Sequence, residues 1–121
     1  LTVQEQRYCV IHAEVAQEHN DINTFLQALL NEDPSALRHC LSGRRRHKSA
    51  DTRRIDNIDW VMCGHTPVLP ENGIRGNTLN LDYGLPAHPP RAALGLYEPG
   101  ENTLWLCHPS LRVTAVNVHD V

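Results

Sequence analysis

Apolar and polar residues alternate with two different periods along the chain, and the change of period divides it into two parts. Between residues 22 and 41, isoleucine, leucine and phenylalanine recur every three or four positions, which is the period of an amphipathic helix. From residue 58 onward, short apolar runs have the period of two that is typical of strands. The expected strands cover residues 8–11, 58–63, 78–82, 92–97, 103–107 and 113–118. The pattern predicts an α/β (α+β) domain with a βα start and a mostly antiparallel carboxyl-terminal meander.

Helix-capping residues divide the first part into two expected helices. Asp21, which follows an asparagine, is a typical N-cap ahead of the first apolar stripe. Pro34 comes after Asp33 and ends this helix or opens the next one, where proline fits the first position. Gly43 follows the second apolar stripe and is expected to end the second helix.

Two of the expected strands end at a histidine that is followed by a small or turn-forming segment. His12 follows the apolar run 8–11, and His65 follows the run 58–63 within Gly-His-Thr-Pro. Glycine allows close approach of the backbone, and proline ends the strand. Open α/β sheets keep their ligand sites at the carboxyl ends of strands, and a neutral imidazole is a common metal ligand. Each histidine taken alone is equally well explained as an ordinary polar residue between a strand and a loop.

The order of the motifs resembles the second half of the calcineurin-like metallophosphoesterases, and most closely their bacterial and phage Ser/Thr protein phosphatases. The matching features are His12-Ala, the basic cluster 44–46, the Gly-His-Thr-Pro turn 64–67 and the strand 77–84 with its Asp-Tyr-Gly. The resemblance covers residues 7–96, most of the chain. It implies a metallophosphatase-type β-sandwich flanked by helices.

The same resemblance implies chemistry for the two histidines. In that family these two histidines bind the same ion of a binuclear centre of manganese, iron or zinc, so their imidazoles are expected to lie close together. A metal-activated water then hydrolyses a phosphate ester. The resemblance therefore makes His12 and His65 the metal ligands, and it implies a hydrolase acting on a phosphorylated protein or a small phosphoester. Binding through neutral imidazole is expected to weaken as the solution is acidified.

Three of the five family motifs are absent from these residues: Asp-x-His, Gly-Asp-x-x-Asp-Arg-Gly and Gly-Asn-His-Glu. The family carries its bridging aspartate, its asparagine ligand and its general-acid histidine in those motifs. We therefore expect residues 1–121 to be a single domain that is the carboxyl-terminal portion of a phosphoesterase, with the missing amino-terminal half as its partner. At most one partial metal site is expected here, no catalytic residue is assigned, and the isolated chain is expected to be inactive.

A strongly basic segment interrupts an otherwise acidic chain. Residues 44–54 contain six Lys or Arg and one Asp, a balance of +5, whereas the remaining residues contain five basic and thirteen acidic ones, a balance of −8. An isolated patch argues against nucleic-acid binding, which needs many spread contacts. The family has a Trp-x-Arg-x-Arg stretch here, which implies a phosphate-gripping role for Arg44 and a second contact by Arg46. Ser42 replaces the tryptophan, and Arg45 is the alternative equivalent of the first arginine.

Tyr83 is a third expected substrate contact. It replaces the threonine of the bacterial pattern, and a tyrosine lines the active site in this region of the eukaryotic phosphatases. The alternative explanation is a half-buried strand tyrosine. The other six histidines are predicted to have no functional role: His19, His39, His47, His88, His108 and His119.

A zinc-binding or otherwise non-catalytic module is the alternative function. Cys9, His12, Cys63 and His65 formally make a Cys₂His₂ set. Cys9 and His12 are an odd number of residues apart, so that side chains in one strand would point to opposite faces. The four cysteines of the chain do not have the spacing of a secreted disulfide framework.

Composition agrees with one small cytoplasmic unit. Hydrophobic residues make up 40% of the chain and aromatic residues 5%, which predicts a modest core for 121 residues. No run approaches the roughly twenty apolar residues that a membrane span requires, and no basic-then-apolar leader occurs. The sequence therefore predicts no membrane association.

Overall fold

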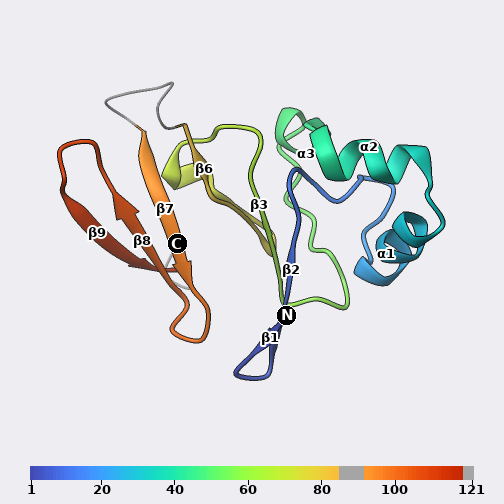
Figure 1. The fold of residues 1–121 in the computed structure, drawn as a ribbon, viewed down its shortest axis with the longest axis horizontal. Helices are drawn as coiled ribbons and strands as arrows, with labels where there is room; N and C mark the ends of the chain where they lie inside the picture. The colour runs from blue at the N-terminus through green and yellow to red at the C-terminus, as the bar shows by residue number, and fades with distance from the viewer. Residues whose placement is uncertain (85–91, 119–121) are drawn as a thin grey trace.

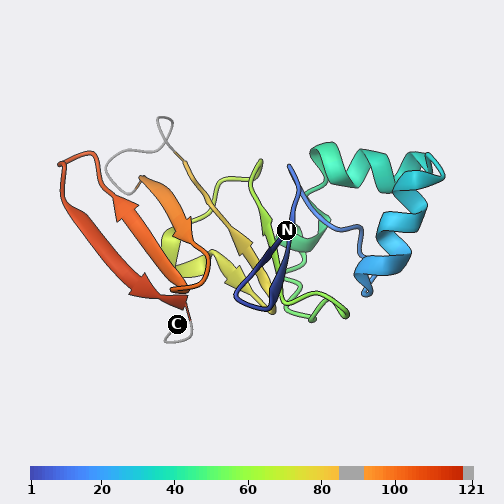
Figure 2. The same ribbon diagram turned by 60° about the horizontal axis from the view of Figure 1, so that its bottom comes forward.

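The computed structural model describes residues 1–84 and 92–118, which fold into three layers. Figures 1 and 2 show the helices on one side of a first sheet and a second sheet on its other side. Among the described residues, no helix is both long and apolar enough to span a bilayer. Along the chain the elements are β1 (Thr2–Val3), β2 (Gln6–Val10), α1 (Ile22–Leu30), α2 (Pro34–Ser42), α3 (Arg45–Lys48), β3 (Trp60–Cys63), the 3₁₀ turn η1 (Pro70–Asn72), β4 (Ile74–Arg75), β5 (Thr78–Asn80), β6 (Asp82–Tyr83), β7 (Ala93–Glu98), β8 (Thr103–Cys107) and β9 (Val113–Asn117).

The first sheet brings the two histidine-bearing strands side by side. Its strand order is β1-β2-β3-β5-β4, and β2, β3 and β5 are parallel. Val10 pairs with Met62, and Cys63 pairs with Asn80, so the three strands end at one edge of the sheet. The loops that follow β2 and β3 therefore leave the sheet next to each other.

The helices begin and end where the capping residues predict. The Asp21 carboxylate accepts a hydrogen bond from the backbone N–H of Asn23, and the Asp33 carboxylate accepts one from Ala36. Pro34 occupies the first turn of α2, and Gly43 is its C-cap. The helical layer packs on the face of the first sheet that carries Val61. Its core consists of Val15, Ala16, Ile22, Phe25, Ala36, Ile55, Ile58 and Val61.

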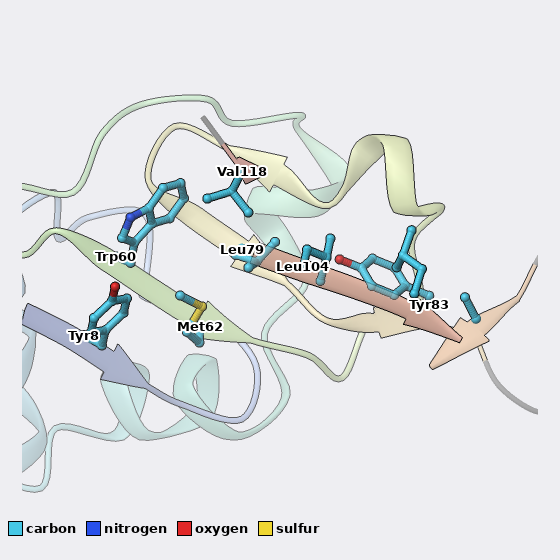
Figure 3. Close-up of a cluster of buried hydrophobic side chains, with 9 residues drawn as sticks. Tyr8, Trp60, Met62, Leu79, Tyr83, Leu104 and Val118 are labelled. Carbon is cyan, nitrogen blue, oxygen red and sulfur yellow. The ribbon is translucent and has the colours of Figure 1, made fainter. Parts of the chain in front are cut away.

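A second core lies between the two sheets. The second sheet is antiparallel with the order β6-β7-β8-β9, which confirms the predicted meander. Figure 3 shows side chains of both sheets meeting in this layer. The core consists of Tyr8, Trp60, Met62, Leu79, Tyr83, Ala93, Leu104, Leu106 and Val118.

The predicted strand 78–82 is wrong in one respect, because it is two strands in two different sheets. β5 ends at Asn80, whose side-chain oxygen accepts the N–H of Asp82 at 2.8 Å. Leu81 leaves the first sheet after its N–H donates to the Cys63 carbonyl at 2.9 Å, and β6 then starts the second sheet. The other predicted strands occur with ends shifted by at most two residues. The short elements β1, β4, η1 and α3 were not predicted.

Candidate metal and phosphate site

The imidazoles of His12 and His65 lie against each other beyond the ends of β2 and β3. His12 Nε2 is 3.2 Å from His65 Nδ1, and the ring centroids are 5.0 Å apart with an interplanar angle of 58°. His12 is exposed and His65 is half-buried. The predicted proximity of the two rings is confirmed.

A tight turn holds His65 in this position. The N–H of Gly64 donates to the His12 carbonyl at 2.9 Å, which ties the two loops together. The N–H of Thr66 donates to the Gly64 carbonyl at 2.8 Å, so the turn is a γ-turn with His65 at its centre. The φ angle of His65 is 71°, in the left-handed region that favours glycine. γ-Turns of this hand are rare and strained, and strained residues cluster at functional sites.

The spacing of the two ring nitrogens fits shared ligation of one ion. Two nitrogen ligands of a tetrahedral or octahedral divalent ion are about 3.0 to 3.4 Å apart. The observed 3.2 Å falls in this interval, and it also fits an N–H···N hydrogen bond between the rings. Within residues 1–84 and 92–118, no three His, Cys, Asp or Glu side chains gather closely enough to hold a metal ion. The described residues thus bring two candidate metal ligands together without a third.

Glu14 is a buried carboxylate that the sequence reasoning did not identify, and it connects three segments around the histidine pair. Its side chain is 7% exposed. Oε1 accepts His39 Nδ1 at 2.8 Å and the N–H of Arg45 at 3.0 Å, and Oε2 accepts the N–H of Arg46 at 2.8 Å. Glu14 therefore fixes α2 and the start of α3 to the loop that carries His12. A Cβ atom at position 43 would overlap the Glu14 side chain, so the close approach of the backbone to Glu14 at this position requires glycine.

His39 is likewise placed differently from the prediction of an ordinary surface residue. It is only 8% exposed and is held by Glu14. His39 belongs to no motif, and the one available signal was its spacing of three residues from Ala36, which places both on the buried face of α2. His88 and His119 lie outside the described residues.

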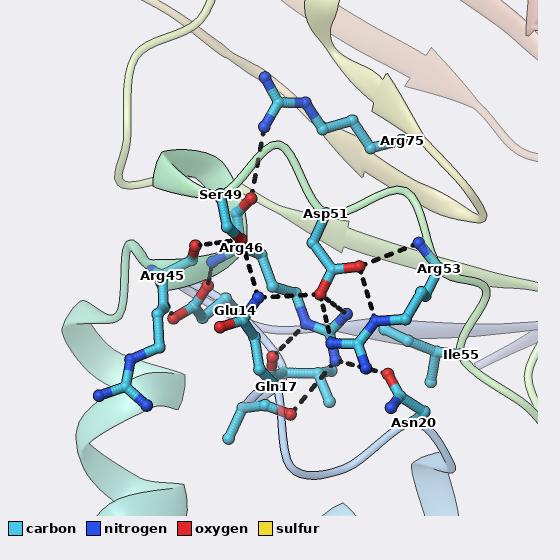
Figure 4. A network of polar contacts seen from close by, with 12 residues as sticks. Glu14, Gln17, Asn20, Arg45, Arg46, Ser49, Asp51, Arg53, Ile55 and Arg75 are labelled. Carbon is cyan, nitrogen blue, oxygen red and sulfur yellow. Dashed lines mark hydrogen bonds and ion pairs between the residues drawn. The ribbon is translucent and has the colours of Figure 1, made fainter.

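Of the two predicted phosphate-binding arginines, the structure brings one to the histidine pair. Arg44 is exposed and lines an open groove of about 500 Å³ together with His65. Arg46 instead points into the protein, where its side chain is 9% exposed (Figure 4). The oxygens around its guanidinium belong to Val15, Ala16, His19, Asn20 and Asp51. Through these hydrogen bonds the Arg46 guanidinium links several segments of the protein. Arg46 does not line the groove.

Asp51 completes the polar network behind α3. Its carboxylate faces Arg46 Nη1 at 3.3 Å and Arg53 Nη2 at 2.6 Å, and it accepts Gln17 Nε2 at 3.0 Å. The hydrogen bonds from Arg53 hold the pKa of this carboxyl well below its usual value, and Gln17 and Arg46 act in the same direction. The network keeps the basic segment folded against the loop 14–20.

Tyr83 lies in the core between the sheets rather than in the groove (Figure 3). The residue is 3% exposed, and its hydroxyl has no hydrogen-bond partner. Burial raises the pKa of Tyr83 to about 12. A Cβ at Gly95 in β7 would overlap the tyrosine ring, so the ring occupies space that only glycine leaves open. The structure therefore supports the alternative explanation of a packed strand tyrosine.

The Cys₂His₂ arrangement gains no support from the geometry. All four of its residues are described, and no group of three metal-binding side chains occurs among the described residues. Cys9 packs against the helical core. Burial raises the pKa of the Cys63 thiol to about 12, which disfavours the thiolate that zinc binds.

Comparison with known protein families, with curated proteins and with solved structures gives no match for this chain.

Proposed function

We propose that this chain contributes two metal ligands and one phosphate contact to a metal-dependent phosphoesterase site. The observation that carries the proposal is the 3.2 Å separation of His12 Nε2 and His65 Nδ1 at the ends of adjacent parallel strands. The strained backbone at His65 adds support, because this γ-turn is what presents its imidazole to His12.

A divalent ion at the histidine pair would supply an activated water and would polarise the phosphoryl oxygens. The residues of this chain have binding and positioning roles. His12 and His65 ligate through neutral ring nitrogens, and the Gly64 N–H bond to the His12 carbonyl keeps the two loops in register. Arg44 offers a planar guanidinium at the groove that His65 also lines, where it can make two parallel hydrogen bonds to a phosphoryl group.

The remaining ligands, the bridging carboxylate and the general acid would come from outside these residues, in the amino-terminal half of the domain. Manganese, iron and zinc all suit a site of this class, and a phosphorylated protein or a small phosphoester is the proposed substrate. If the histidine pair is only a hydrogen-bonded structural contact, the chain is instead a non-catalytic module.

A metal titration separates these two functions. Mn²⁺ is added to the ¹⁵N-labelled protein, and paramagnetic broadening is followed at the loops 11–14 and 63–66. We expect selective broadening of these loops, reversed by EDTA and lost in His12→Ala and in His65→Ala. His108→Ala is the matched control, because His108 bonds Thr114 in the second sheet and lies outside the pair. Broadening that is absent, or equal in all variants, contradicts the proposal.

A further inference from the structure

The groove beside the histidine pair is lined by cationic and polar side chains. Its volume of about 500 Å³ is large compared with one phosphate group. The residues that line it are His39, Ser42, Arg44, Arg45, Lys48 and His65. Among the described residues, no Asp or Glu lines the groove, so it is a candidate binding place for a polyanion.

Two of these cations lie at opposite ends of α3, Arg44 as its N-cap and Lys48 as its last residue. The N–H of Lys48 donates to the Arg44 carbonyl at 2.9 Å, so the two positions are one helical turn apart. With a rise of 1.5 Å per residue, the two positions are about 6 Å apart along the axis. That distance is longer than the separation of two phosphorus atoms joined by one bridging oxygen, and it is comparable with the separation of the two outer phosphates of a linear triphosphate.

The cations of the groove are not neutralised by neighbouring carboxylates. Within residues 1–84 and 92–118, the ion pairs involve the carboxylates of Glu14 and Asp51, and none of them includes Arg44, Arg45 or Lys48. Figure 4 shows the Arg45 guanidinium extending away from the polar network. Glu14 is the opposing charge beneath the groove, but both of its oxygens already accept hydrogen bonds from the protein.

We infer that Arg45 and Lys48 form a second phosphate subsite next to Arg44, and that the substrate is a small molecule with at least two adjacent phosphates. This inference rests on the proposed function, in which Arg44 holds the phosphoryl group beside the histidine pair. A simple phosphate monoester would leave the outer cations of the groove without a partner. A polyphosphate chain bound along α3 engages Arg44 and Lys48 together.

Anion binding without metal tests the inference. Calorimetric titrations of the protein with orthophosphate and with tripolyphosphate are made in EDTA at low ionic strength. We expect tripolyphosphate to bind roughly tenfold more tightly, since each exposed charge pair adds a modest increment. Lys48→Gln and Arg45→Gln should weaken tripolyphosphate binding and leave orthophosphate binding unchanged, whereas Arg44→Gln should weaken both.

Arg112→Gln is the charge-matched control, because Arg112 is exposed in the turn between β8 and β9. An equal loss in this variant would show that only net charge matters, and equal affinities for the two anions would show that there is no second subsite. Either result overturns the inference. Because the titration contains no metal, its failure is distinct from failure of the manganese experiment. Arg44, Arg45 and Lys48 are exposed, so thermal unfolding serves as a check that the variants fold normally.

Discussion

The backbone of His65 is held in a conformation that glycine adopts without strain and histidine does not. Its φ of 71° lies in a γ-turn closed by the Thr66 N–H. A non-glycine residue in such a conformation costs on the order of 1–3 kcal/mol of folding free energy. The chain keeps histidine there, which is expected if the imidazole is retained for binding rather than for stability.

Substitution of His65 should therefore show a trade between stability and metal binding. We expect His65→Gly to unfold at a higher urea concentration than His65→Ala, by about 1 kcal/mol in free energy of unfolding, because glycine relieves the positive φ. Both variants should lose the manganese-dependent broadening. Urea unfolding followed by circular dichroism measures the difference.

Position 12 provides the matched control for this prediction. His12 has no positive φ, so His12→Gly should be less stable than His12→Ala by roughly 0.5–1 kcal/mol. The order of the glycine and alanine variants should reverse between the two positions. The same order at both positions would show that the γ-turn is not strained.

The histidine pair could be predicted from sequence because local patterns fix it. A strand run followed by histidine occurs twice, and parallel strands in one sheet bring their ends together. Arg46 could not be distinguished from Arg44 in this way. Three consecutive arginines look alike in sequence. The acceptors that hold the Arg46 guanidinium include the carbonyls of Val15 and Ala16 and the Asp51 carboxylate, which are 31, 30 and 5 residues away from Arg46.

At the scale of elements, the basic segment 44–54 has two faces. Arg44, Arg45 and Lys48 line the open groove, while Arg46 is buried and Arg53 pairs with Asp51. The net charge of the segment can be predicted from sequence. Which of its side chains face the groove and which are buried cannot, because α3 is a four-residue helix without an apolar stripe. Glu14 caps its first N–H groups and Asp51 bonds its arginine, and both contacts are tertiary.

The carboxylate of Asp51 should make folding stability sensitive to acid. The pKa of folded Asp51 lies below the ordinary value near 3.8, so the unfolded chain takes up the proton first as pH falls. The stability contributed by this group is present above about pH 4 and is lost as pH falls toward the folded pKa. We expect the free energy of unfolding to fall less steeply between about pH 5 and pH 2 in Asp51→Asn than in the natural sequence.

Arg53→Gln tests the cause of that pH dependence. The Arg53 hydrogen bonds are the largest contribution to the lowered pKa, so their removal should give an acid slope between those of the natural sequence and Asp51→Asn. Urea unfolding at a series of pH values gives the three slopes. Identical slopes in all three proteins would mean that Asp51 does not couple folding to acid.

At the scale of the whole molecule, the layers were predictable and the second, antiparallel sheet was found as expected. The point where the chain changes sheets was not predictable. The sequence predicts one continuous strand over residues 78–82, because the alternation of apolar and polar residues is the same in both sheets. The division is made by the Asn80 side chain and by the bond from Leu81 to Cys63, which only the assembled sheet provides.

Under the proposed function the molecule holds half of a reaction site, which leads to a prediction about turnover. In the proposed function two histidines and one arginine bind an ion and a phosphate, but no third metal-binding side chain joins the histidines among residues 1–84 and 92–118. We expect this chain alone to hydrolyse p-nitrophenyl phosphate no faster than buffer containing manganese, because an activated water needs a fixed, fully ligated ion. The rate is measured by p-nitrophenolate absorbance with and without EDTA. Robust manganese-dependent turnover that disappears in His65→Ala would show that the 121 residues contain a complete site, whereas metal binding without turnover is the behaviour that two ligands allow.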